Sequence, residues 1–255
     1  MRPVELAFKV IEKLSTHQPV GVSELARLME IPKSTVQRVL VSLQQTGWIE
    51  PSAGDRPVWR LTIRALVASG QTSVHHGPLR AIALGVMEDL RRHSEETVLL
   101  TRRFQDMLVL VERLDGIRPV RYFFPYGAVS PLHSTATGQA MLAALPAGDL
   151  DAYLDHAMMA VTGRTVTDPA MLREVLEKVR TRGFAVNLGG NTADVHAVGA
   201  AIIARDGMPI AGVSVSAPAE RLHKATASLL GPVVADAARR ISLGLAAEST
   251  SPLDD

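Results

Sequence analysis

The spacing of hydrophobic residues predicts two short helices near the N-terminus of the chain. The first covers residues 22–29. The second lies within residues 33–47, and its apolar residues recur at the spacing of a buried helix face: Val36, Val39, Leu40 and Leu43. Pro32 separates the two segments, because proline lacks a backbone N–H and disfavours a helical residue before it. The pattern therefore predicts two helices joined by a tight turn, and a further helix over residues 2–17 should pack against them.

The polar face of the second helix suits contact with DNA. No acidic residue occurs from position 32 to position 48, and the outward residues are Lys33, Ser34, Thr35, Gln37 and Arg38. Lysine and arginine bind phosphates and guanine edges, and serine, threonine and glutamine bind other base edges. An ordinary helical hairpin with a solvated polar face is the alternative, and the helical pair alone leaves the two interpretations evenly matched.

Residues 48–61 predict a short β-hairpin directly after the helical pair. Two apolar arms flank a proline-rich turn, and Arg56 and Arg60 place positive charge on the hairpin, where it suits backbone phosphates. A helix, a helical pair and a basic hairpin in this order are typical of a winged helix-turn-helix. We therefore expect residues 1–62 to form a DNA-binding domain.

The rest of the chain mixes helical and strand-like segments. Residues 62–76 have no strong helix breaker except Gly70, and residues 63–77 are therefore expected to form a helical linker. Further helices are expected at 78–93, 134–145, 149–154, 168–182 and 218–246, and strands at 97–101, 107–112, 120–124, 184–188, 197–204 and 210–217. Residues 78–247 should therefore form an α+β domain, an antiparallel sheet with flanking helices. The polar tail 248–255 is expected to be disordered.

Composition narrows the class of protein. Hydrophobic residues make up 47% of the 255 residues, as in a globular chain, and a net charge of +1 excludes a broadly basic nucleic-acid coat. Any DNA contact must therefore be local. The chain has no cysteine, and charged residues stand near its N-terminus where a signal peptide needs an apolar core. We expect a cytoplasmic protein that does not bind membranes.

The common motifs of catalysis and metal binding are missing from the sequence. No glycine-rich nucleotide loop and no GxSxG, HExxH or CxxC motif occurs, and the eight histidines are scattered. His133 lies beside Ser134, but no acidic residue nearby in the sequence could orient a catalytic base. The sequence therefore predicts no enzyme, no metal site and no cofactor.

An uncharged block, residues 122–148, is the main candidate for a ligand site. Its first five residues include Tyr122, Phe123, Phe124 and Tyr126, and the small residues 134–138 follow at a predicted helix start. Free N–H groups and the positive end of the helix dipole favour a carboxylate there. The block predicts a pocket for a small organic acid, with Phe123, Phe124 or Tyr126 near one wall. The alternative, that these aromatics are sheet core and the loop a capped turn, has equal weight on the residues alone.

A second run of small and polar residues, 187–199, could supply polar groups to the same cavity. It contains Asn187, His196 and several glycines, which permit tight turns and close approach of a ligand. A flexible hairpin without a ligand is the alternative, and the residues favour it slightly.

The chain resembles the IclR family of bacterial transcriptional regulators over nearly its whole length. The resemblance rests on IPKSTVQRVL at 31–40, on PLHSTATGQAMLA at 131–143, and on RGFAV, GAAI, DG and AGVSVS within 182–216. It implies a DNA-binding domain, a linker helix and a GAF-like effector-binding domain, in dimers that often pair into tetramers. It also implies a repressor or activator, commonly of operons for organic-acid or aromatic catabolism.

In this family the effector is held at the small-residue helix start after a histidine. The resemblance places these contacts at Ala136 and Thr137, and later ones at Asn187 and Ala197. His133 and Ser134, just before these small residues, are further candidates for effector contact. Two departures bear on the ligand more than on the fold. Gly189-Gly190 stand where an acidic pair is common, and Ala201 where a proline is frequent.

We therefore expect a transcriptional regulator whose binding to operator DNA responds to a small organic acid. Its expected partners are duplex DNA, that acid and further copies of itself, as a homodimer or a dimer of dimers. Two competing classes stay open: an enzyme with an appended winged-helix module, and an interaction module that uses the winged helix for protein contacts. The operator, the effector and the sign of regulation also stay open.

Overall fold

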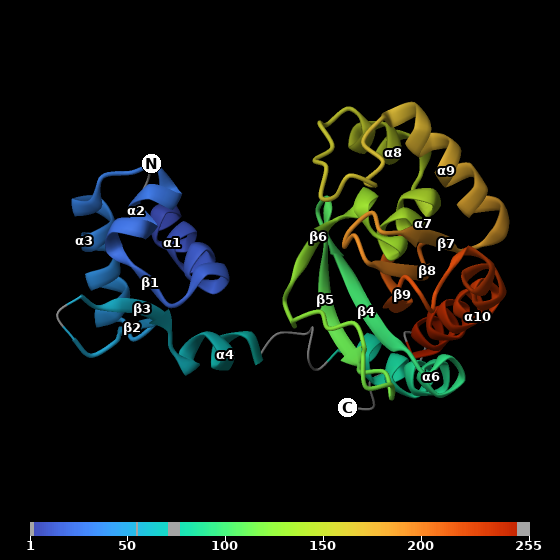
Figure 1. The fold of residues 1–255 in the computed structure, drawn as a ribbon, viewed down its shortest axis with the longest axis horizontal. Coiled ribbons are helices and arrows are strands. Elements are labelled where there is room, and N and C mark those ends of the chain that lie inside the picture. Colours follow the sequence, from blue (N-terminus) through green and yellow to red (C-terminus); the bar gives the residue numbers. More distant parts are fainter. Residues whose placement is uncertain (1–2, 55, 71–76, 249–255) are drawn as a thin grey trace. The chain divides into compact units, whose positions relative to one another are not determined.

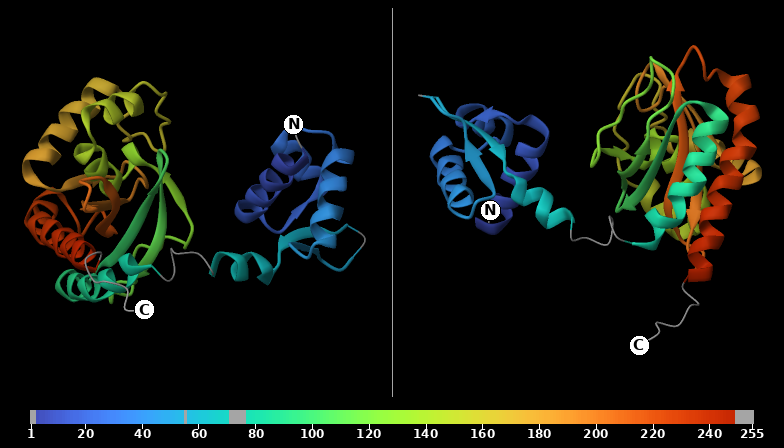
Figure 2. Two further views of the ribbon diagram at one scale, coloured as in Figure 1. Left: turned by 180° about the vertical axis from the view of Figure 1, so that it is seen from behind. Right: turned by 90° about the horizontal axis from the view of Figure 1, so that it is seen from below.

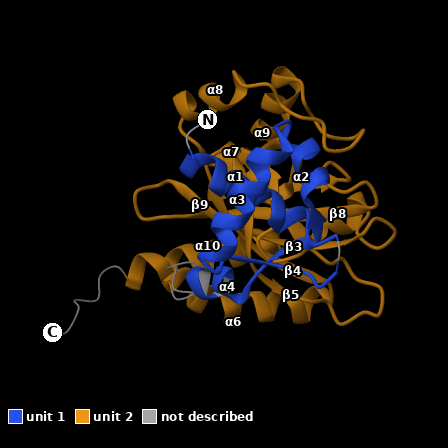
Figure 3. Cartoon of the chain, turned by 90° about the vertical axis from the view of Figure 1, so that its left-hand side faces the viewer, with its two compact units in different colours: residues 1–75 blue, residues 76–255 orange. Residues whose placement is uncertain are grey.

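The computed structural model describes residues 3–54, 56–70 and 77–248 (Figure 1, with further views in Figure 2). The chain divides into two compact units, Met1–His75 and His76–Asp255 (Figure 3). The end of the expected linker, residues 71–76, and all of the expected disordered tail except Glu248 lie outside the described residues.

The first unit is a helix-turn-helix with a small sheet. Its elements are α1 (Pro3–His17), β1 (Val20–Gly21), α2 (Val22–Met29), α3 (Lys33–Gln45), β2 (Ile49–Pro51), β3 (Val58–Leu61) and α4 (Ile63–Gly70). The sheet has the antiparallel order β1-β3-β2, so a short strand joins the expected hairpin. Leu14, Leu25, Leu40 and Trp59 are buried in one core that joins the three helices to the sheet. The expected winged helix-turn-helix architecture is confirmed.

The second unit is built on a six-stranded antiparallel sheet of order β6-β5-β4-β9-β8-β7. Its elements are α6 (Pro78–Ser94), β4 (Thr97–Phe104), β5 (Met107–Leu114), β6 (Val129–Pro131), η1 (Leu132–Ser134), α7 (Ala136–Ala144), α8 (Ala147–Leu154), α9 (Pro169–Arg182), β7 (Ala185–Leu188), β8 (Val195–Ile203), β9 (Pro209–Pro218) and α10 (Lys224–Glu248). The expected α+β class is confirmed. The hairpin turn between β8 and β9 contains Gly207 at φ 85°, a conformation that glycine adopts without strain.

Helices cover both faces of this sheet. α6 and α10 pack together on one face, and α7 packs on β8 and β9 from the other, with α9 outside it (Figure 2). Glycines permit the closest contacts: a β-carbon on Gly244 of α10 would stand 2.6 Å from the Cγ2 atom of Ile82 in α6. A β-carbon on Gly212 of β9 would stand 2.9 Å from the β-carbon of Thr137 in α7. α7 therefore lies almost against the strand backbone, which positions its first turn over the middle of the sheet.

Two expected elements differ from the structure. Residues 120–124 are not a strand but part of a loop, and the edge strand β6 forms later in the chain. Prolines at 119 and 125 flank the segment, and proline cannot donate to a strand ladder. The last helix begins at Lys224 rather than at Pro218, because Pro218 still belongs to β9 and a turn follows it. Over the described ranges, no helix is long and apolar enough to cross a membrane.

Candidate functional site

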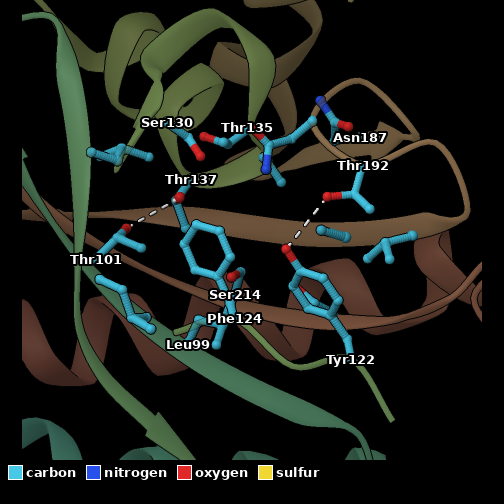
Figure 4. Close-up of a pocket in the computed structure, with 17 residues that line it drawn as sticks. Leu99, Thr101, Tyr122, Phe124, Ser130, Thr135, Thr137, Asn187, Thr192 and Ser214 are labelled. Atoms are coloured by element: carbon cyan, nitrogen blue, oxygen red, sulfur yellow. Dashed lines mark hydrogen bonds between the residues drawn. The ribbon is translucent and has the colours of Figure 1, made fainter. Parts of the chain in front are cut away.

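The second unit contains a partly open cavity of about 50 Å³ between the sheet, the first turn of α7 and two loops (Figure 4). Residues 115–128, between β5 and β6, form one loop, and we call this segment the lid. Residues 189–194, between β7 and β8, form the other. The lining residues are Leu99, Thr101, Leu108, Leu110, Tyr122, Phe124, Ser130, Thr135, Ala136, Thr137, Asn187, Asn191, Thr192, Val195, Ala197, Ser214 and Ser216.

The first turn of α7 opens onto this cavity. The Thr135 side chain caps the helix by accepting a hydrogen bond from the Gly138 N–H at 3.0 Å. Gly138 must be small, because a β-carbon there would stand 2.0 Å from the Leu132 carbonyl oxygen. Ala136 and Thr137 line the cavity and carry two of the first-turn N–H groups that precede the intrahelical ladder. The positive end of the helix dipole therefore faces the cavity.

The floor of the cavity presents hydroxyl groups that the sequence interpretation missed. Ser214 and Ser216 are buried on β9 and lie two residues apart, so both point to the same face of the sheet. Ser130, on β6, is also buried and lines the cavity. Alternation within the run VSVS at 213–216 was the signal that would have identified the two β9 serines.

The lid closes the cavity with two aromatic rings. Tyr122 and Phe124 stack with ring centroids 6.0 Å apart. The Tyr122 hydroxyl lies 3.5 Å from the Thr192 hydroxyl on the opposite loop (Figure 4). Burial raises the pKa of Tyr122, so its hydroxyl is neutral near pH 7. The Thr97 hydroxyl also holds the lid, by donating to the Tyr122 carbonyl oxygen at 2.9 Å.

Two of the predicted wall residues lie outside the cavity, which corrects that expectation. Phe123 is 63% exposed and stacks beneath the Arg113 guanidinium, whose carbon lies 4.0 Å from the ring centroid. Tyr126 is 57% exposed and donates a hydrogen bond to Glu112 at 2.7 Å. Phe124, the third predicted wall residue, does line the cavity.

His133 and Ser134 hold the helix start in place but do not line the cavity. The Tyr153 oxygen accepts from the His133 backbone N–H at 3.1 Å and lies 2.7 Å from His133 Nδ1. Nε2 donates to the Met159 carbonyl oxygen at 3.0 Å. Burial raises the pKa of Tyr153 to about 12, so its hydroxyl keeps its proton near pH 7. Ser134 donates to the Pro131 carbonyl and to the Asn191 side chain.

Of the later predicted residues, Asn187 and Ala197 line the cavity and His196 does not. The Asn187 amide donates to the Ser134 carbonyl oxygen at 2.9 Å and accepts from the Gly190 N–H at 2.7 Å. This bridge ties the second loop to the start of α7. His196 points to the opposite face of the sheet, where its Nδ1 lies 2.9 Å from the Leu222 carbonyl oxygen. Successive strand residues face opposite sides, so Ala197 and its neighbour cannot both reach the cavity.

The cavity surface is mainly apolar, with several hydroxyl and amide groups and, among its described residues, no charged side chain. Among the described residues that line it, none is an aspartate, glutamate, lysine, arginine or histidine. Within the described part of the chain, no group of three or more metal-ligating side chains comes together. The arrangement can therefore bind a small molecule through hydroxyls, amides and helix N–H groups, beside two aromatic rings.

The polar face of α3 is open to solvent in the first unit. Lys33, Ser34, Gln37 and Arg38 are exposed and Thr35 is half-buried, while Val36, Leu40 and Leu43 face the core. The two basic residues of the hairpin differ. Arg56 is exposed, whereas Arg60 donates across the strands to Glu50 at 2.8 Å.

Comparison with known proteins identifies the family to which the chain belongs. The model of the bacterial transcriptional regulator IclR C-terminal domain matches residues 71–243, and that of the IclR helix-turn-helix domain matches residues 3–53. The chain is 31% identical to the HTH-type transcriptional regulator BhcR of Paracoccus denitrificans, over 96% of this chain and 88% of that protein. It is 34% identical to the glycerol operon regulatory protein of Streptomyces griseus, over 89% of each chain.

Solved structures show the same fold. The Thermotoga maritima IclR structure is 27% identical, with a TM-score of 0.72 over 95% of this chain and 98% of that chain. An IclR homologue from Microbacterium hydrocarbonoxydans, solved with 4-hydroxybenzoate, has a TM-score of 0.78 over 96% of this chain and all of that chain. At 22% identity this second likeness bears on the fold alone.

These matches cover both units and account for their architecture. The first unit is a DNA-binding helix-turn-helix domain, and the second is a GAF-like effector-binding domain. Proteins of this kind regulate transcription and are not enzymes. The chain belongs to the IclR family of bacterial transcriptional regulators.

Proposed function

We propose that the cavity binds a small organic acid and that this binding changes the affinity of the protein for its operator DNA. One observation carries the proposal: the N-terminal turn of α7 opens into a cavity without charged side chains. Backbone N–H groups at Ala136 and Thr137 can hold a carboxylate, and each hydrogen bond to a charged group contributes about 1.5–3 kcal/mol. The serines of β9 would bind a neutral oxygen at the other end of the ligand.

The size of the cavity favours a short-chain acid. An engineered apolar cavity of roughly 150 Å³ holds benzene. The cavity here, at about 50 Å³, is smaller, so an aromatic acid requires the lid to move outward.

A small polyol is the second candidate. The hydroxyl-rich lining, with Thr101, Ser130, Ser214 and Ser216, favours a ligand with several neutral oxygens. The relative named a glycerol operon regulatory protein agrees with that chemistry. Direct comparison of glycolate with glycerol separates the two candidates, because only the acid uses the charge preference of the helix start.

DNA binding would use the exposed face of α3 and the hairpin. In this proposal Gln37 and Arg38 reach base edges, Ser34 and Thr35 lie beside them, and Lys33, Arg56 and Arg60 contact phosphates. Exposure of the α3 residues supports these roles. The pairing of Arg60 with Glu50 gives it less freedom to reach DNA than Arg56 has.

We also propose that the protein binds DNA as a homodimer or a dimer of dimers. One recognition helix covers only a few base pairs, and two-fold pairing doubles the contacts on a palindromic site. Val4 and Phe8 on α1 are 67% and 61% exposed, and large exposed apolar side chains support association. Sedimentation should show at least a dimer at micromolar concentration. A monomer that retains full DNA binding would contradict this part of the proposal.

Two adjacent phenylalanines provide a matched test of the ligand site. Calorimetry should measure binding of glycolate, lactate, benzoate, 4-hydroxybenzoate and glycerol to the parent, Phe124→Ala and Phe123→Ala. We expect at least one acid to bind the parent, with affinity reduced by about tenfold in Phe124→Ala, the loss of roughly 1.4 kcal/mol of contact. Phe123→Ala should bind like the parent, since its ring lies outside the cavity. Equal affinity in all three proteins would place the ligand elsewhere.

A further inference from the structure

Glu112 is a buried carboxylate outside the cavity, and a β-bulge determines which way it points. The register between β4 and β5 shifts so that Leu100 opposes Glu112 while Thr101 opposes Leu110. Leu100 and Thr101 are neighbours on one strand, so they face opposite sides of the sheet. Leu110 therefore faces the cavity, and Glu112 faces the side of the sheet that α6 covers.

The two carboxylate oxygens of Glu112 bind two different parts of the domain. Oε1 accepts from the Tyr126 hydroxyl at 2.7 Å and from the Arg113 backbone N–H at 2.9 Å. Oε2 accepts from Arg80 Nε at 2.6 Å. Burial alone would raise the pKa of Glu112, but the hydrogen bonds from Tyr126 and the Arg113 backbone, together with Arg80, bring that pKa below its ordinary value. The Glu112 side chain is 7% exposed, so its charge depends on these partners.

Tyr126 belongs to the lid, whose other face closes the cavity. Phe124, two residues earlier, lines the cavity, and its carbonyl oxygen accepts from Arg113 Nη1 at 2.5 Å. The Arg113 guanidinium carbon also lies 5.2 Å from the Tyr126 ring centroid. Outward movement of Phe124 must therefore disturb the partners of both Arg113 and Glu112.

Arg80 lies at the start of the effector-binding domain. It is in the first turn of α6, which begins at Pro78, directly after the segment that connects the two domains in the chain. The side-chain position of Arg80 is fixed by Glu112 on one side and by its own helix on the other. A change at Glu112 therefore reaches the part of the domain nearest in sequence to the DNA-binding unit.

We propose that Tyr126, Glu112 and Arg80 are positioning residues that transmit the position of the cavity lid to the start of α6. The participation of these residues in the response to a ligand rests on the proposed function. The coupling between the lid and the start of α6 does not. When the lid moves, Oε1 loses one of its two donors, the Tyr126 hydroxyl, and the loss of a hydrogen bond to a buried carboxylate is costly. Glu112 then reorients toward its remaining donors, the Arg113 backbone N–H and Arg80, and the first turn of α6 shifts with Arg80.

Hydrogen exchange on the full-length protein tests the link without ligand or DNA. The amides of residues 82–85 bond to the first-turn carbonyls of α6, so they report its opening. We expect Phe124→Ala, which loosens the lid, and Tyr126→Phe, which removes one hydroxyl, each to speed exchange there by about fivefold or more. The double variant should exchange no faster than the faster single variant, because the second change acts on a link that is already broken.

Matched controls separate transmission from general loosening. Tyr153→Phe removes a buried tyrosine hydroxyl from the His133 network and should leave α6 exchange unchanged. Arg80→Lys, which keeps the charge, should restore most of the protection that Arg80→Gln loses. The proposal would be overturned if the increase in α6 exchange rate in the double variant equalled the product of the increases in the two single variants. Unchanged α6 exchange in Tyr126→Phe would also overturn it.

The affinity for DNA tests whether a change at Arg80 reaches the DNA-binding unit. The probe is the duplex that the parent selects from a random library. Arg80→Gln should change affinity for that duplex by about fivefold or more in the absence of any ligand. Unchanged affinity would overturn transmission to the DNA-binding unit. Failure of every acid to bind the cavity would remove the proposed function and leave the exchange result standing.

Discussion

Gly199 on β8 lies so close to Thr137 that a β-carbon at position 199 would stand 2.6 Å from the Thr137 backbone nitrogen. The same β-carbon would stand 2.8 Å from the carbonyl carbon of Ala136. Both distances are shorter than van der Waals contact, and both involve backbone that cannot rotate away. The absence of a side chain at Gly199 therefore fixes how deeply the first turn of α7 sits on the sheet, and hence where its N–H groups meet the cavity.

Gly199→Ala should displace that first turn and weaken ligand binding. Overpacking of this kind typically costs about 1–3 kcal/mol of stability. Gly85→Ala is the control, because Gly85 lies within α6 with no atom near its missing β-carbon, and alanine there should add roughly 0.5–1 kcal/mol. Denaturant unfolding measures both changes. Equal stability of the two variants would show that α7 is not held at this depth.

The Glu112 network should make the stability of the effector-binding domain depend on pH in acid. The folded-state pKa of Glu112 lies below its ordinary value, because hydrogen bonds from Tyr126, the Arg113 backbone and Arg80 outweigh its burial. Its contribution is therefore present in full above the unfolded-state pKa and is lost as pH falls through the folded-state pKa. Scanning calorimetry from about pH 6 to pH 3 should show a shallower fall in melting temperature for Glu112→Gln than for the parent. Parallel curves would contradict the assignment.

Arg38→Ala should weaken operator binding and relax sequence preference. A base-reading arginine contributes about 1–3 kcal/mol, whereas loss of a phosphate contact weakens all sequences alike and lowers the salt slope by about one. Arg56→Ala should behave in the second way. Arg27→Ala, an exposed arginine on α2 that pairs loosely with Glu24, is the control. Selection from a random DNA library, followed by titration at several salt concentrations, distinguishes the two effects. If Arg38→Ala binds as tightly as the parent, the recognition assignment is wrong.

The N-terminal domain was predictable because its signals are local. The buried face of α3 follows from the helical spacing of Val36, Leu40 and Leu43, and Pro32 marks where that helix begins. The start of α7 was equally visible, since Gly138 and its small neighbours permit the close packing that the structure has. In each case the residues that determine the geometry are adjacent in the sequence.

The orientation of the lid could not be predicted from local pattern. Tyr122, Phe123 and Phe124 are all aromatic, so their sequence does not show which side faces the cavity. Anchors distant in the chain decide it: Thr97 holds the Tyr122 carbonyl, and Arg113 holds the Phe124 carbonyl. The direction of Glu112 likewise depends on a bulge, which the alternation of the β5 residues does not reveal.

The affinity of the protein for its selected DNA duplex, with and without the organic acids, tests the proposed function most directly. At least one of glycolate, lactate, benzoate and 4-hydroxybenzoate should change the affinity of the parent by about fivefold or more. Ala136→Leu places a larger side chain where Ala136 lines the cavity, so it should bind the duplex like the unliganded parent and show no response to that acid. An equal response in the parent and in Ala136→Leu, or no response of the parent to any of the four acids, would contradict an organic-acid site at the start of α7.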